Sequence, residues 1–205
     1  MTIKFDCIVE GHGEVQSVPV LIRRIAAELY PELTIDIPRP IRVHRDKVVK
    51  DDELEREVEF AARKIQGQGA ILIILDSGND CPAELGPTLL HRASQAHSNL
   101  PIAVVLAKQE FEAWFLAAAE SLRGKRGLKN DINPPNNPEA IRGAKEWLRQ
   151  RMQSGNTYRS KRDQPALAAL FDITQARHAD SFDKCYGDIG RFLEELQKAN
   201  DSTSE

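Results

Sequence analysis

Short apolar runs alternate with segments of helical periodicity through residue 122. The run at residues 70–75 is apolar without alternation, which is typical of a strand buried on both faces of a parallel sheet. Other runs, some of them punctuated by proline, predict strands at residues 3–9, 33–37, 41–43 and 101–106. Apolar residues at helical spacing predict helices at residues 15–29, 51–65, 82–97 and from 111 onward.

This order of elements predicts an α/β fold. We expect a Rossmann-like, mostly parallel sheet with helices on both faces, built from residues 1–122. Glycines and an Asn/Pro-rich stretch then predict a basic loop or linker at residues 123–138. Helical patterns resume and predict a C-terminal helical extension packed on the core, residues 139–199, before a tail at residues 200–205.

The amino-acid composition limits the class of protein to which this chain can belong. A chain of 205 residues with 41% hydrophobic and 29% charged residues suits one soluble globular domain, or one domain with an appendage. Its longest apolar run is too short to span a membrane, and no signal-peptide pattern opens the sequence. Cys7, Cys81 and Cys185 form no zinc or disulfide pattern. We therefore expect a cytoplasmic protein without a membrane partner, and the sequence indicates no oligomeric state.

The charge is unevenly distributed along the chain. Residues 121–165 hold eleven Lys/Arg and four Asp/Glu, a net charge of +7. Because the whole chain carries −3, the remaining residues carry −10. An acidic body with a basic segment is compatible with a metal ion held in one part and a polyanion in the other. Solvated helix faces are the alternative interpretation.

Acids follow three of the predicted strands. Glu10 follows the first strand, Asp76 and Asp80 follow the buried strand at 70–75, and Glu110 and Glu112 follow the next. The carboxyl ends of parallel strands share one edge of a sheet, where ligands bind in open α/β folds. Gathered carboxylates predict a divalent cation held by oxygen. Glu110 and Glu112 are two residues apart on a predicted helix, so we expect at most one to face the site.

Glycines and basic residues supply candidate phosphate contacts. Gly11 and Gly13 form a turn between strand and helix that lets backbone approach a ligand, although no phosphate-loop or dinucleotide glycine motif is present. Plainer interpretations stay open, with Glu14 in the first turn of a helix and Asp80 as a helix cap before Pro82. The basic candidates for phosphate or nucleic-acid binding are Lys108, Arg123, Lys125, Arg126, Lys161 and Arg162.

These motifs resemble the Toprim domain of topoisomerases, primases, recombination-repair proteins and OLD-family nucleases. A closer resemblance is to an uncharacterised bacterial Toprim-like family, domain of unknown function 4276. An Asp-x-Asp motif running into Cys-Pro-x-x-Leu-Gly looks like residues 76–86, and a Glu-x-Glu-x-Trp-like segment looks like residues 110–114. Tyr158, Lys161 and Gln164 also look like the tail of that family.

The resemblance implies a Toprim fold and roles for the acids. Glu10 would handle the proton in phosphodiester chemistry. Asp76 would bind Mg²⁺, or Mn²⁺ in its place, with Asp80, Glu110 and Glu112 as further candidate ligands. This chain departs from the pattern at Gly78, which stands where the second Asp of Asp-x-Asp is expected.

Three functional hypotheses follow. The resemblance implies a Mg²⁺-dependent protein that processes phosphodiester bonds in DNA or RNA, most simply a nuclease, acting with an ATPase partner protein in defence against phage. The alternative is a non-catalytic, Toprim-like binding or regulatory module whose metal site is weakened at Gly78. A third is a small phosphate-ligand enzyme on a doubly wound fold. Gly78 favours the second, whereas the presence of Glu10, Asp76 and Asp80 together favours the first.

Overall fold

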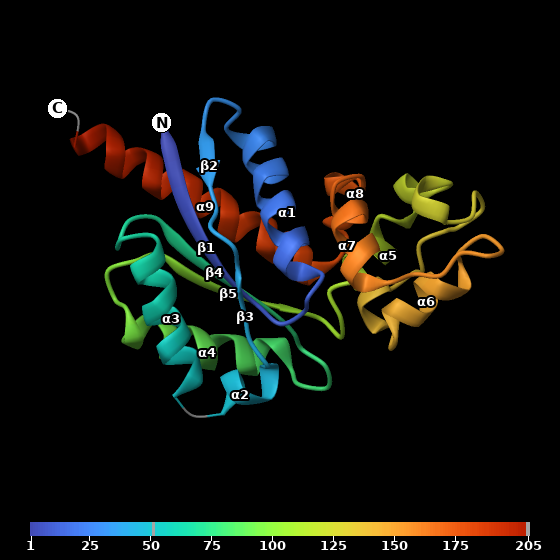
Figure 1. Cartoon of the computed structure of the whole chain (residues 1–205), viewed down its shortest axis with the longest axis horizontal. Coiled ribbons are helices and arrows are strands. Elements are labelled where there is room, and N and C mark those ends of the chain that lie inside the picture. The colour runs from blue at the N-terminus through green and yellow to red at the C-terminus, as the bar shows by residue number, and fades with distance from the viewer. Residues whose placement is uncertain (51, 204–205) are drawn as a thin grey trace.

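A parallel β-sheet forms the centre of the molecule in this computed structural model, which describes residues 1–50 and 52–203. The strands run in the order β2-β1-β4-β5, and the short β3 pairs with the carboxyl end of β1 (Figure 1). Their bounds are Thr2–Val9 (β1), Thr34–Asp36 (β2), Ile41–Arg42 (β3), Ala70–Asp76 (β4) and Ile102–Ala107 (β5). All pairs among these strands are parallel, so the predicted α/β fold is confirmed.

Helices cover both faces of the sheet (Figure 1). Successive side chains of a strand point to opposite faces, and in β1 this sends Cys7 toward α1 and α9 and Ile8 toward α3 and α4. The bounds of these covering helices are Glu14–Leu29 (α1), Glu53–Lys64 (α3), Pro82–Ala96 (α4) and Asp180–Thr203 (α9). The C-terminal helix α9 therefore packs on the sheet itself. Within the described residues, no helix has the length and apolar character to cross a membrane.

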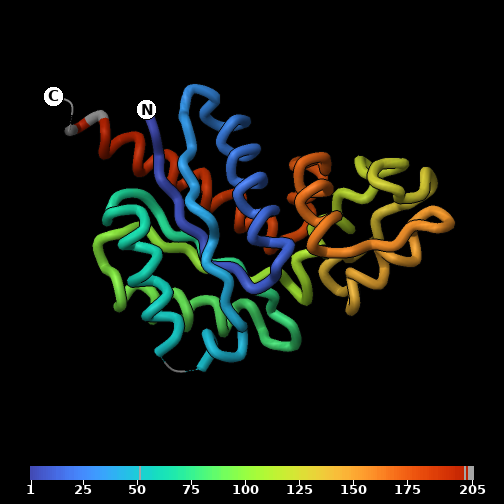
Figure 2. The backbone as a smooth tube through the Cα atoms, viewed as in Figure 1, coloured from blue at the N-terminus to red at the C-terminus, as the bar shows by residue number. Residues whose placement is uncertain are grey.

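Most of the shorter helices lie beyond the carboxyl ends of the strands (Figure 2). The short α-helices are Arg45–Val49 (α2), Ala113–Ala117 (α5), Ala144–Gln150 (α6), Ser160–Ala168 (α7) and Ile173–Ala176 (α8). The 3₁₀ turns are Ala119–Leu122 (η1), Lys125–Gly127 (η2) and Pro138–Ala140 (η3). The apolar spacing at residue 111 predicts a longer helix than the structure has, because α5 gives way to a 3₁₀ turn after Ala117. This group of short helices covers the edge at which the strands end.

An aromatic cluster joins the short helices to the sheet. The rings of Trp114 and Phe182 have centroids 5.3 Å apart, and those of Phe115 and Phe171 are 5.7 Å apart, both in edge-to-face arrangement. All four side chains are buried in the same core as one face of the sheet. Burying a large apolar side chain contributes about 1.5–3 kcal/mol. The short helices are therefore fixed to the sheet by a shared core.

Arg24 of α1 makes a second connection between the sheet layer and the short helices. Its Nη1 donates to the carbonyl of Ala168 and its Nη2 to that of Phe171, each at 2.7 Å. The last carbonyls of a helix have no partner within that helix. Arg24 satisfies such groups at the end of α7, so it holds that helix against α1.

We expect Arg24→Met to lower the free energy of unfolding by about 1.5–3 kcal/mol, because two hydrogen bonds from a charged donor are lost. Urea denaturation followed by circular dichroism measures the change. Arg23→Met, on an exposed position of the same helix, is the matched control and should stay within about 0.5 kcal/mol of wild type. Equal stability of the two variants would contradict the anchoring role of Arg24.

Candidate functional site

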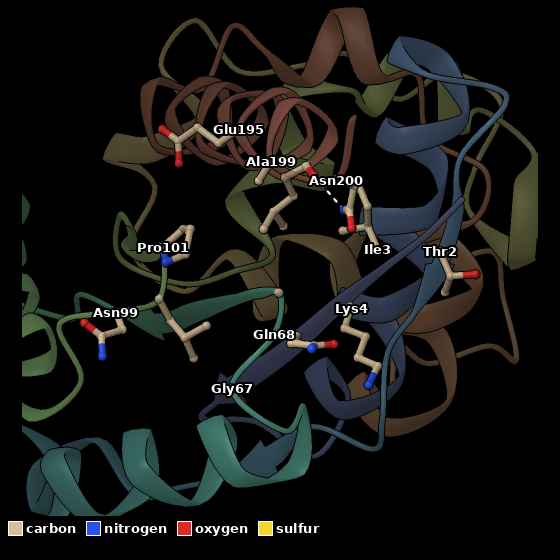
Figure 3. Close-up of a pocket in the computed structure, with 13 residues that line it drawn as sticks. Thr2, Ile3, Lys4, Gly67, Gln68, Asn99, Pro101, Glu195, Ala199 and Asn200 are labelled. Carbon is tan, nitrogen blue, oxygen red and sulfur yellow. Dashed lines mark hydrogen bonds between the residues drawn. The ribbon is translucent and has the colours of Figure 1, made fainter. Parts of the chain in front are cut away.

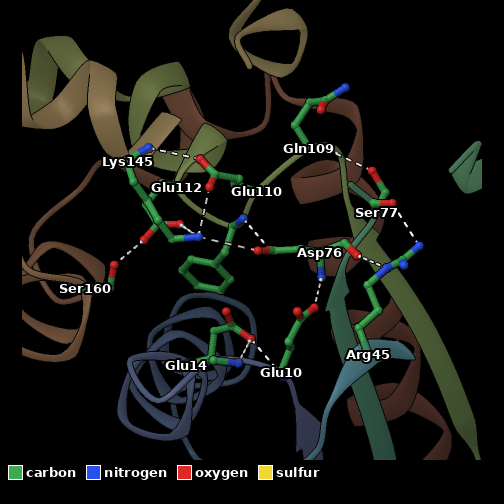
Figure 4. Close-up of polar contacts among 12 residues, drawn as sticks. Glu10, Glu14, Arg45, Asp76, Ser77, Gln109, Glu110, Glu112, Lys145 and Ser160 are labelled. Atoms are coloured by element: carbon green, nitrogen blue, oxygen red, sulfur yellow. Dashed lines mark hydrogen bonds and ion pairs between the residues drawn. The ribbon is translucent and has the colours of Figure 1, made fainter. Parts of the chain in front are cut away.

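Glu10 and Asp76 lie side by side at the carboxyl edge of the sheet (Figure 4). β1 and β4 are neighbouring parallel strands with Val9 opposite Ile74, so the residues that follow emerge at the same edge. The backbone amide of Asp76 donates to Glu10 Oε2 at 3.2 Å. The structure thus brings together two acids that the sequence predicts at one edge of the sheet.

The Asp76 carboxylate is held from two sides. The backbone amide of Phe111 donates to Oδ1 at 2.7 Å, and Lys145 Nζ lies 3.6 Å from Oδ2. Burial raises the pKa of Asp76 well above its ordinary value, the negative charge of Glu14 adds to the increase, and Lys145 opposes it. A carboxylate in such surroundings is stabilised by any additional positive charge.

Glu14 closes the turn between β1 and α1. Its Oε2 accepts from the backbone amides of Glu10 at 3.1 Å and Gly11 at 3.0 Å. A Cβ at position 11 would stand 2.6 Å from Glu14 Oε1, so a larger residue there would displace the Glu14 carboxylate. Burial raises the pKa of Glu14 to about 7, although the hydrogen bond from Gly11 lowers it. Glu14 is therefore both the first residue of α1 and part of the acidic group.

Lys145 places one positive charge among three carboxylates. Its Nζ lies 3.1 Å from Glu110 Oε1 and 3.3 Å from Glu112 Oε2, in addition to its contact with Asp76 (Figure 4). Burial alone would lower the pKa of Lys145, but these acids raise it above its ordinary value. The sequence gives no signal for this residue, since 35 positions separate it from Glu110. We name Lys145 and the five acids Glu10, Glu14, Asp76, Glu110 and Glu112 the carboxylate site.

Both Glu110 and Glu112 contact the Lys145 ammonium, although we expected at most one of them to face the site. That expectation assumed a helix at these positions. The helix α5 begins only at Ala113, and residues 110–112 form a turn in which side chains two apart reach the same ammonium group.

Glu112 is the most deeply held of these acids. It is fully buried, and its Oε1 accepts from the hydroxyls of Tyr158 and Ser160, each at 3.0 Å. Within the described residues Oε2 makes no hydrogen bond and is faced by the Lys145 ammonium. Burial and Glu112 raise the pKa of Tyr158 far above its ordinary value. Tyr158 therefore packs and donates a hydrogen bond rather than presenting a ring for stacking.

A pocket of about 370 Å³ opens beside these acids. Its lining includes Glu10, Asp76 and Lys145, with Lys161 from α7. The carboxylate oxygens suit a hard divalent cation, although the lining holds as many basic residues (Arg42, Lys145 and Lys161) as acids. In the described part of the chain, however, no group of three or more His, Cys, Asp or Glu side chains is arranged to hold a metal ion. The carboxylate oxygens are suitable ligands for Mg²⁺, but the Lys145 ammonium lies among them.

A family model for a domain of unknown function, DUF4276, matches residues 9–189. The chain belongs to the DUF4276 family. No match was found among curated proteins or among solved structures.

The loop after β4 in this DUF4276 protein carries Asp80 away from the carboxylate site. Asp80 pairs with the Arg45 guanidinium of α2. The same guanidinium donates to the carbonyl of Asp76 at 2.9 Å and that of Ser77 at 3.0 Å. Gly78 has a φ of +55°, which glycine adopts easily. Arg45, which sequence reasoning missed, thus holds the loop on the far side of Asp76.

The six predicted basic residues do not form one surface. Lys161 lines the pocket of the carboxylate site. Lys108 lines a different pocket, Arg162 pairs with buried Asp163, and Arg123 donates to the carbonyl of Ile132. Lys125 and Arg126 are exposed in η2. Only Lys161 therefore stands next to the acids, and Gly11 and Gly13 share that pocket with it.

A pocket at the opposite edge of the sheet lacks this chemistry. It has a volume of about 460 Å³ and lies between the amino ends of β1 and β5 and the end of α9 (Figure 3). Its charged lining residues are Lys4 and Glu195, which lie on opposite sides of it. The candidate site is therefore at the carboxyl edge.

We expect Tyr158→Phe to lower the free energy of unfolding by about 1–3 kcal/mol, because buried Glu112 loses one of its two hydroxyl donors. Tyr186→Phe is the matched control, since its hydroxyl donates to Glu28 at the surface, and should change stability by less than about 0.5 kcal/mol. Urea denaturation of both variants makes the comparison. A Tyr158 variant as stable as the control would show that Glu112 does not depend on this contact.

Proposed function

We propose that this protein is a Toprim-like, Mg²⁺-dependent enzyme that processes phosphodiester bonds in DNA or RNA, most simply a nuclease. The observation that carries the proposal is the pairing of Glu10 with Asp76 at the carboxyl edge of the sheet. That edge is the usual ligand site of open α/β folds. Two acids there with different surroundings suit different tasks, proton transfer and cation binding.

Asp76 and Glu112 are the residues that would hold Mg²⁺, with Glu110 beside them. The cation would stabilise negative charge on phosphate oxygens and help to generate the attacking hydroxide. Glu10 lines the pocket, and the one hydrogen bond that its carboxylate accepts within the described residues comes from the amide of Asp76. Its remaining acceptor capacity is therefore available to take a proton in the reaction.

Phosphate recognition is assigned to the turn and to α7. The turn at Gly11 and Gly13 brings backbone to the pocket, and the Lys161 side chain lines it from the other side. Exposed Lys125 and Arg126 add positive charge farther along the basic segment and would contact the nucleic-acid backbone. The Toprim resemblance alone supports a cytoplasmic role in phage defence with an ATPase partner.

We expect the protein to cleave plasmid DNA, single-stranded DNA or RNA with Mg²⁺ or Mn²⁺, and EDTA to abolish the cleavage. Glu10→Gln and Asp76→Asn should each reduce the rate by about 100-fold or more, as loss of acid–base or metal chemistry does. Gel electrophoresis of time courses measures the rates. Asp80→Asn, outside the carboxylate site, is the control and should retain most of the activity. Cleavage that is absent, or that survives both substitutions, would refute the nuclease proposal.

A second candidate is a non-catalytic, Toprim-like binding or regulatory module. It is favoured by Gly78, which supplies no ligand, and by the pairing of Asp80 with Arg45 rather than with the carboxylate site. In this case the Lys145 ammonium is the permanent counterion of the acids. Metal binding separates the two candidates.

Under the first candidate, Lys145→Met should bind Mn²⁺ about tenfold more tightly than wild type, because an ammonium that competes for the same oxygens is removed. Isothermal titration calorimetry measures the affinity without reference to activity. Lys161→Met, which lines the same pocket but has no ion pair with these acids, is the control and should bind as wild type does. Absence of Mn²⁺ binding to wild type and to Lys145→Met alike would favour the non-catalytic module.

A further inference from the structure

A second pocket adjoins the carboxylate site from the other face of the sheet. It has a volume of about 720 Å³, within the range of small-molecule sites, and lies between α4, β5 and the start of α9. Its apolar walls are formed by Pro82, Pro87 and Leu90 of α4 and by Val104 and Leu106 of β5. Side-chain alternation at the end of β4 sends Asp76 to one pocket and Ser77 to the other. We name this second space the α4–β5 pocket.

The α4–β5 pocket is kept open by a glycine inside a helix. Gly86 lies within α4 and lines the pocket, and a Cβ built on it meets nothing within 4 Å. Glycine inside a helix costs about 1 kcal/mol relative to alanine. The absence of a side chain here leaves space that a larger residue would fill.

A buried acid faces the α4–β5 pocket. Glu139 is only 4% exposed, and its Oε1 accepts from both the amide and the hydroxyl of Ser181 at the start of α9. Ser181 Oγ is itself fixed, since it accepts from Trp114 Nε1 at 2.8 Å. Glu139 lines the pocket, and within the described residues its Oε2 accepts no hydrogen bond, nor is it one of the buried atoms that lack a partner, so this oxygen remains accessible. An accessible carboxylate oxygen of a side chain held in place by Ser181 can accept a hydrogen bond from a donor on a ligand.

Besides Glu139, the charged residues that line the pocket are Asp80, Asp180, Lys108 and Lys184. Lys108 follows β5, and its side chain is exposed. Within the described residues it forms no ion pair. A ligand with a flat apolar body, a donor for Glu139 and a negative group for Lys108 matches these features together. A nucleotide has all three.

We propose that the α4–β5 pocket binds an unpaired nucleobase that carries an amino group, namely adenine, cytosine or guanine. The base lies between the apolar walls, as extruded bases do, and its amino group donates to Glu139 Oε2. The inference rests on the proposed function, because the base belongs to the nucleotide next to the phosphodiester bond at Asp76. It assigns the substrate as a strand with at least one unpaired base.

Calorimetric titration of the protein with AMP, CMP, GMP and UMP in EDTA tests the proposal, because EDTA removes any contribution from a metal. We expect at least one amino-bearing nucleotide to bind at least about tenfold more tightly than UMP, the difference that one good base contact supplies. Cys81 gives a second measurement. It lines the pocket and is the exposed thiol of the three, so bound nucleotide should slow its alkylation by iodoacetamide.

Three variants make the test specific. Glu139→Gln preserves the contact with Ser181 but turns a donor toward the pocket, so AMP, CMP and GMP should lose about tenfold in affinity while UMP gains. Gly86→Leu fills the pocket and should abolish binding, and the open space at its Cβ allows it to fold. Gly187→Leu is the matched control, because Gly187 is an exposed helical glycine of α9 with nothing within 4 Å of its Cβ.

The outcomes are separable from those of the cleavage experiment. Nucleotide binding that is lost in Gly86→Leu, and retained in Gly187→Leu and in Asp76→Asn, supports the pocket even if the protein cleaves nothing. The proposal is overturned if no nucleotide binds saturably, or if binding survives Gly86→Leu. It is also overturned if arginine amide, titrated as a cationic alternative to a nucleotide, binds in place of nucleotides. Cleavage with no such binding refutes the pocket alone.

Discussion

Mutual repulsion among carboxylates is the constraint on which this structure depends. Five acids gather where the strands end, and one ammonium group, that of Lys145, lies within 3.6 Å of three of them. Unpaired charge in a buried site is costly, and the raised pKa values of Asp76 and Glu14 express that cost. The short helices beyond the sheet are arranged so that this cation reaches the acids.

The sheet and its acidic edge follow from local features of the sequence. Apolar runs of strand length, separated by helical periodicity, are enough to predict the order of elements, because parallel strands require crossover helices between them. Once the strands are parallel, the residues after each must meet at one edge. Glu10 and Asp76 were therefore predictable from the places where two apolar runs stop.

The parts that the sequence does not reveal are contacts between distant segments. Lys145 is one of eleven basic residues in its region, and nothing in its local pattern separates it from the others. Arg45 lies on a helix of five residues, too short for periodicity to show. The roles of Glu110 and Glu112 depend on where α5 begins, and helix boundaries are uncertain by one or two residues when read from sequence.

The position of Lys145 in the sequence also means that it is synthesised after the acids that it contacts. Asp76, Glu110 and Glu112 precede it in the chain, so the ribosome delivers these acids before the cation that contacts them. Until residue 145 has been made, these acids lack the ammonium group that lies among them in the folded protein. The carboxylate site can therefore be completed only after α6 has been synthesised.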